Sequence, residues 1–163
     1  GLLFAFEQTS ASTVVIWTLT GTLGFAYATA ATAAPSAVDT TGYVLGQLPF
    51  AMHAAWLVAA SIVSTNLAAV AVGASSSAQI SLAWASEVTA AVCTAGLSLY
   101  FNEPTFALVG AWALRAISKF EAPEEIQKKF KPEQRQSIQS FAGNAAVALA
   151  VLGLTVAVRG QVM

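Results

Sequence analysis

Two long stretches of this chain are almost free of charge, and they constrain its fold more than any other feature. Residues 8–38 contain no Asp, Glu, Lys or Arg, and in residues 40–86 His53 is the only side chain that titrates near neutrality. The hydrocarbon core of a bilayer is about 30 Å thick and is crossed by a helix of roughly 20 mostly apolar residues. Such a helix satisfies its own backbone hydrogen bonds. The sequence therefore predicts an all-α integral membrane protein.

The composition supports this prediction and excludes several functions. Of the 163 residues, 56% are hydrophobic and 9% are charged, whereas roughly a quarter are charged in an ordinary soluble domain. The net charge of -1 leaves no basic excess, so we expect no nucleic-acid partner. One histidine and one cysteine cannot supply the four ligands of a zinc site. The sequence also lacks a phosphate-binding glycine loop, a His-Glu-x-x-His motif and a nucleophile elbow, and we expect no enzymatic activity.

Turn residues divide the apolar sequence into a single domain of about five transmembrane helices. The breaks fall at Pro35, at Gly73 with the three serines that follow, and at Asn102 to Pro104. The expected spans are residues 12–34, 49–73, 78–101, 104–120 and 139–158, with a polar connector at 121–137. The first span is rich in Thr and Ala, so we expect its insertion to depend on neighbouring helices.

The polar connector predicts the orientation of the bundle. Together with Arg115 and Lys119 it contains six of the seven basic residues, and basic loops stay on the cytoplasmic side of a membrane. We therefore expect it to face the cytosol, matrix or stroma. With five spans, the start of the chain lies on that same side and its end on the other. Pro123 can open a short helix that pairs Glu124 with Lys128 on an exposed face.

Glu87 is the one carboxylate that lies well inside an expected span. It belongs to a row of residues spaced four apart on one side of the expected helix, and the row includes the small residues Ala83 and Ala91. Small residues at this spacing let membrane helices approach closely. A carboxylate within the bilayer is costly unless it is paired or protonated. The favoured interpretation is a neutral or hydrogen-bonded group that fixes helix packing. The alternatives are coordination of a ligand or pigment and a proton relay.

Four further polar or aromatic side chains are candidates for ligand binding. His53 opens the second span, where a hydrogen-bonded interfacial role is favoured over ligation of a metal-centred tetrapyrrole. Trp84 lies beside the turn that carries Glu87, so it could flank a flat ligand, although anchoring or packing is favoured. We expect Asn66 to hydrogen-bond across helices. The complete candidate set for cofactor binding is His53, Trp56, Asn66, Trp84 and Glu87.

Three stretches resemble one known family. Residues 45–70, LGQLPFAMHAAWLVAASIVSTNLAAV, place Trp56 after a Pro-aromatic pair and before Asn66, and they resemble a helix of the tryptophan-rich sensory protein or translocator protein (TspO) family. The opening LLFAFEQTSAS and the stretch FALVGAWALRAI at 106–117 are similar to other helices of that family. Its Trp-x-Pro-Pro motif is absent. The resemblance implies a five-helix bundle with an apolar cavity near Trp56 that binds porphyrins and sterol-like lipids.

The sequence is compatible with three functions. The favoured one is a non-catalytic accessory subunit of an organellar bioenergetic complex such as a photosystem, packed against other transmembrane subunits and membrane lipids. No cofactor is certain from the sequence, and the candidates are chlorophyll or another tetrapyrrole, a carotenoid and a lipid. The chain begins at Gly1 without a basic leader, as expected of a processed or partial sequence, and a plastid thylakoid is favoured over the mitochondrial inner membrane. The alternatives are a self-standing TspO-like binder of tetrapyrrole or lipid and a small proton-coupled transporter that depends on Glu87.

Overall fold

The computed structural model describes residues 8–33, 40–121 and 124–162 of the chain. Throughout these residues the regular structure is helical and contains no strand, which confirms the predicted all-α class. The elements are α2 (Thr9–Ala33), α3 (Thr40–Gly42), the π-helical turn η1 (Tyr43–Gln47), α4 (Leu48–Ala71), α5 (Ser76–Phe101), α6 (Pro104–Lys119), α7 (Glu124–Lys129) and α8 (Pro132–Val162).

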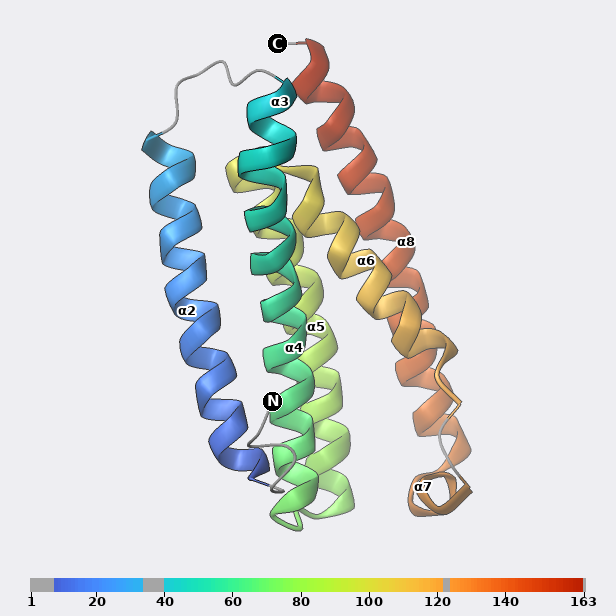
Figure 1. Ribbon diagram of the computed structural model, residues 1–163. Helices are drawn as coiled ribbons and strands as arrows, with labels where there is room; N and C mark the ends of the chain where they lie inside the picture. The colour runs from blue at the N-terminus through green and yellow to red at the C-terminus, as the bar shows by residue number, and fades with distance from the viewer. Residues whose placement is uncertain (1–7, 34–39, 122–123, 163) are drawn as a thin grey trace.

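The five long helices form a bundle in which consecutive helices run in alternating directions (Figure 1). The beginning of α2 and the short helix α7 lie at one end of the bundle, and the end of α8 lies at the other. This arrangement agrees with the predicted order, in which the polar connector and the start of the first span share one side. The compartment that this end faces stays a prediction.

Helix α6 has the expected bounds to within one residue, but it is too short to cross a bilayer unaided. Within the described residues, four segments are long and apolar enough to cross a bilayer: Thr9–Thr32, Thr40–Ala71, Ser76–Phe101 and Pro132–Arg159. Helix α6 has 16 residues, which at about 1.5 Å per residue gives about 24 Å, less than the roughly 30 Å of the hydrocarbon core. Of the five long helices that the structure describes, four therefore meet the length of a span. The short α6 instead packs between α4, α5 and α8.

The polar connector is also shorter than predicted. We expected it to extend to residue 137, but residues 132–137 are helical and form the first turns of α8. Proline suits the first turn of a helix, and Glu133 complements the positive end of the helix dipole. The helix therefore begins outside the apolar region and continues into it. The short helix expected after Pro123 is confirmed as α7, whereas Pro35 and Pro123 themselves lie outside the described residues.

Small side chains let the helices approach closely. The most extensive helix contact joins α6 to α8, where an added Cβ at Gly153 would come within 2.8 Å of Leu108. One buried cluster forms this contact: Ala107, Ala111, Leu114, Ala142, Ala146 and Leu149. A second buried cluster consists of Tyr27, Ala51, Ala54, Ala55 and Phe106. The alanines at 142, 146 and 150, which are spaced four residues apart, thus face the core.

Hydroxyl groups join α2 to α4. Thr20 and Ser61 share a hydrogen bond at 2.6 Å between their hydroxyls. Thr13 and Ser64 share another at 2.8 Å, and the indole Nε1 of Trp17 donates to Thr65 at 2.9 Å. Lipid offers no competing hydrogen bonds, so such pairs can associate membrane helices that apolar burial would not. They explain how a span rich in Thr is accommodated beside its neighbour.

The turn between α5 and α6 is fixed by its own side chains. Asn102 ends α5 in the left-handed conformation with φ of 51°, which asparagine tolerates better than most residues. The buried Glu103 accepts hydrogen bonds from the backbone N–H and the hydroxyl of Thr105. Tyr43 of η1 donates its hydroxyl to the same Oε1 at 3.0 Å. The predicted break at Asn102 to Pro104 is therefore confirmed.

Candidate functional site

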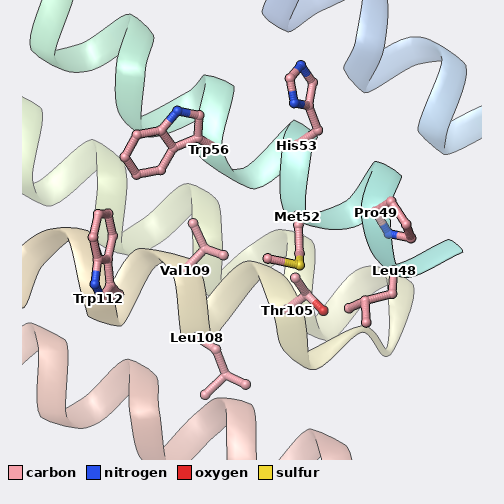
Figure 2. A pocket seen from close by; sticks show the side chains of 9 residues that line it. All are labelled: Leu48, Pro49, Met52, His53, Trp56, Thr105, Leu108, Val109 and Trp112. Atoms are coloured by element: carbon pink, nitrogen blue, oxygen red, sulfur yellow. The ribbon is translucent and has the colours of Figure 1, made fainter. Parts of the chain in front are cut away.

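A groove between α4 and α6 is the main candidate site. It has a volume of about 720 Å³, which falls within the usual range of roughly 300–1,000 Å³ for small-molecule sites. Figure 2 shows the side chains that line it: Leu48, Pro49, Met52, His53 and Trp56 from the first wall, and Thr105, Leu108, Val109 and Trp112 from the second. Most of these side chains are apolar.

Two tryptophans from different helices meet in this groove. The ring centroids of Trp56 and Trp112 lie 5.2 Å apart, with the ring planes inclined at 48°. Both rings remain accessible, at 47% and 59% exposure. Because the surrounding helix surfaces are apolar, these rings would face hydrocarbon in a bilayer. The pair provides an aromatic surface against which a flat ligand can stack.

His53 lies at the edge of the groove. Its side chain is exposed, and Figure 2 shows the imidazole directed away from Met52 and from the α6 wall. The ring nitrogens therefore do not point at the space beside the tryptophans. This placement fits the interfacial role that the sequence favoured better than ligation of a metal in the groove.

The second wall of the groove is anchored by the turn that precedes it. Thr105 lines the groove, and both its backbone N–H and its hydroxyl donate to Glu103. Since Tyr43 donates to the same carboxylate, the beginning of α4 and the beginning of α6 are held together there. The hydroxyl of Thr105 is occupied by this contact.

Asn66 and Trp84 lie outside the groove and serve helix packing. The amide of Asn66 donates to the hydroxyl of Ser86 at 2.7 Å, joining α4 to α5, which confirms the expected bond across helices. The ring of Trp84 contacts Phe141 of α8, with centroids 5.4 Å apart. The packing interpretation of Trp84 is thus the one that its contacts favour.

Glu87 is buried in the bundle, also apart from the groove. Its side chain is 3% exposed, and neither carboxylate oxygen has a hydrogen-bond partner among the described residues. Ala91, one turn further along the same row, packs against the α6–α8 cluster, so the row faces inward as predicted. The five candidate residues therefore do not form a single site, because only His53 and Trp56 line the groove.

Trp112 is the principal groove residue that the sequence interpretation did not select. One tryptophan occurs in each of the first four expected spans, and nothing in their spacing distinguishes Trp112 from Trp84. The available signal is its place in the stretch 106–117, which resembles a helix of the TspO family. Met52 and Thr105 also line the groove and carry no distinctive sequence pattern.

Comparison with known proteins decides the family. A family model described as TSPO-like protein matches residues 2–156, which is nearly the whole chain. The chain belongs to the TSPO-like family. No curated protein and no solved structure matched it. The two walls of the groove in this TSPO-like protein come from the stretches 45–70 and 104–117, which include the residues on which the family resemblance rests.

Proposed function

We propose that this TSPO-like protein is a non-catalytic membrane protein that binds a flat, largely apolar ligand of the tetrapyrrole class in the α4–α6 groove. The observation that carries the proposal is the contact between Trp56 and Trp112 across the groove, at 5.2 Å between ring centroids. Two indole rings from separate helices offer a large aromatic surface at a small cost in side-chain entropy. The family match supports the same class of ligand through the resemblance to TspO proteins.

The chemistry of the walls favours a ligand that arrives through the membrane. Met52, Leu108 and Val109 contribute apolar surface, while the hydroxyl of Thr105 is occupied by Glu103. The exposed indole rings leave the groove open toward the lipid side of the helices. A carotenoid or a lipid chain would meet the same surface, but it would gain less from stacking on two rings.

Porphyrin titration tests this proposal. Protoporphyrin IX is added to the purified protein in mild detergent, and binding is followed by tryptophan fluorescence and by porphyrin absorbance. Trp56→Ala and Trp112→Ala should each weaken binding about tenfold, since an aromatic pair and its buried area contribute on the order of 1.5 kcal/mol. Trp17→Ala is the matched control, because Trp17 is 45% exposed but lies on α2 outside the groove. Unchanged affinity in both groove variants, or an equal loss in the control, contradicts the proposal.

A metal-containing porphyrin distinguishes stacking from ligation. Because the imidazole of His53 lies at the edge of the groove and is directed away from its α6 wall, His53→Ala should weaken binding of the free-base and the iron porphyrin to the same small extent. A selective loss for the iron porphyrin, together with a shift of its absorption band, would instead assign His53 as an axial ligand.

A second candidate function is that of an accessory subunit in a larger organellar complex such as a photosystem. The surface of α2 favours it. This helix packs chiefly on α4, and its other side exposes large apolar residues such as Val14, Leu19 and Phe25. A native gel of mildly solubilised source membranes tests the idea. Migration in a large pigmented band would support it, and migration as a small colourless species would exclude it.

A further inference from the structure

A second cavity lies at the opposite end of the bundle from the turn between α5 and α6. It has a volume of about 540 Å³ and is formed where α5 begins, α6 ends and α8 begins, near the end that carries α7 (Figure 1). Its lining combines apolar side chains, three glutamines, one arginine and one glutamate. It shares no lining residue with the α4–α6 groove.

Arg135 is the side chain in this cavity that has a buried polar atom without a hydrogen-bond partner in the described part of the chain. It is the fourth residue of α8 and is partly buried, and its Nε atom is buried without a hydrogen-bond partner in the described part of the chain. Glu121 also lines the cavity, yet it is exposed and forms no ion pair with Arg135. A buried guanidinium N–H without an acceptor is costly. Arg135 therefore has no carboxylate partner among the residues that the structure describes.

The glutamines of the cavity do not provide that acceptor. The amide of Gln79 donates to the carbonyl of Ala74, and that of Gln139 donates to the carbonyl of Phe120 at 2.7 Å. The side-chain oxygen of Gln134 accepts from the backbone N–H of Lys131. These bonds hold the polar wall in place around Arg135. The remaining lining is apolar and includes Ile80, Ala83 and Ile117.

The position of the cavity along the bundle places it at the membrane surface. Helix α8 has 31 residues and is about 46 Å long at about 1.5 Å per residue, so it extends beyond a hydrocarbon core of about 30 Å. Arg135, in its first turns, then lies at headgroup depth. Residues 115–135 carry six basic and four acidic side chains. This local positive charge attracts anionic lipids.

We propose that this cavity binds one anionic phospholipid of the adjacent leaflet. The headgroup phosphate accepts hydrogen bonds from the guanidinium of Arg135, which presents donors in a fork that matches phosphate oxygens. The first part of an acyl chain lies along Ile80, Ala83 and Ile117. A free phosphate ion would satisfy Arg135 but would leave this apolar surface uncovered, and for that reason a lipid is the occupant that fits both parts.

Native mass spectrometry of the full chain tests the proposal. The detergent-solubilised protein is titrated with phosphatidylglycerol and, separately, with phosphatidylcholine. We expect one tightly retained phosphatidylglycerol and a preference over phosphatidylcholine that falls roughly tenfold in Arg135→Gln, as expected for loss of charge-assisted hydrogen bonds. The matched control is Lys131→Gln, which removes the same charge four residues earlier from an exposed side chain that does not line the cavity. This variant should change the preference less than twofold. Equal losses in both variants would overturn the site and leave only diffuse surface attraction.

Two further measurements keep the test decisive. Arg135→Lys preserves the charge but not the fork, so it should fold and retain an intermediate preference; a preference as high as that of the unaltered protein would contradict the assigned geometry. Inorganic phosphate at millimolar concentration should not displace the bound lipid. Displacement by phosphate alone would overturn the lipid in favour of a soluble anion. None of these outcomes depends on porphyrin binding in the α4–α6 groove.

Discussion

Gly110 of α6 lies directly against the side chain of Thr94 on α5. A Cβ added at Gly110 would come within 2.8 Å of the Thr94 Cβ and 2.9 Å of its Cγ2. Thr94 is fully buried and its hydroxyl is bonded to the carbonyl of Ala90, so it cannot move aside easily. Gly110→Ala should therefore separate the two helices and lower the unfolding free energy by about 1–3 kcal/mol. A thermal or SDS-induced unfolding curve in detergent measures the change.

Gly96→Ala is the control for that substitution. Gly96 lies on the same helix as Thr94, and an added Cβ there would meet nothing within 4 Å. Alanine should slightly stabilise the helix at this position, by about 0.5–1 kcal/mol. A loss of stability at Gly96 equal to that at Gly110 would show that close approach is not the cause.

The hydroxyl bonds between α2 and α4 predict a second effect. Replacing Thr13 and Thr20 together by Val removes their bonds to Ser64 and Ser61 while preserving side-chain shape. Because interhelical hydrogen bonds in membranes contribute about 0.6 kcal/mol each, the double variant should lose about 1 kcal/mol. In the control Thr18→Val, the hydroxyl bonds only to its own helix, at the carbonyl of Val14, and stability should be unchanged within error. Cysteine crosslinking between α2 and α4 provides an independent reading of their proximity.

The bond from Tyr43 to Glu103 predicts a third effect. Tyr43→Phe removes the donor and leaves the ring, so the unfolding free energy should fall by about 1.5–3 kcal/mol if the carboxylate is charged and by about 1 kcal/mol if it is neutral. Tyr100→Phe is the matched control because Tyr100 is highly exposed on α5. The same loss of stability from both substitutions would contradict the assigned role of Tyr43.

Substitutions of Glu87 distinguish a structural role of this side chain from a role in proton-coupled transport. Burial of a carboxyl group without hydrogen-bond partners is unfavourable, so Glu87→Leu should raise the unfolding free energy by about 1–3 kcal/mol. A decrease would mean that Glu87 has a stabilising partner such as water or a ligand. In proteoliposomes, a proton-coupled transporter would lose pH-dependent transport in Glu87→Gln. Normal transport in that variant would exclude Glu87 as the coupling group.

The sequence was sufficient to predict the helices and the breaks between them, because charges, prolines and Asn102 mark where apolar helices stop. It also placed Glu87 on an inward row, since the small residues beside it restrict which side can pack. It did not show which helices form the groove. Apolar residues surround most of the circumference of α2, α4, α5 and α8, so hydrophobic periodicity does not indicate which side of each helix faces the core. The spacing of Trp84 and Trp112 does not distinguish them, and only the family-like stretch 106–117 around Trp112 pointed to its side of the bundle.

The hydrogen-bonded interface between α2 and α4 has a practical consequence for work on the isolated protein. Its hydroxyl bonds have no competitor in hydrocarbon, but water that penetrates a detergent micelle can replace each of them. We therefore expect α2 to loosen on solubilisation, whereas none of its residues lines the α4–α6 groove. A preparation that still binds ligand can thus have lost a native helix contact, and ligand binding alone would not establish that the extracted protein is intact.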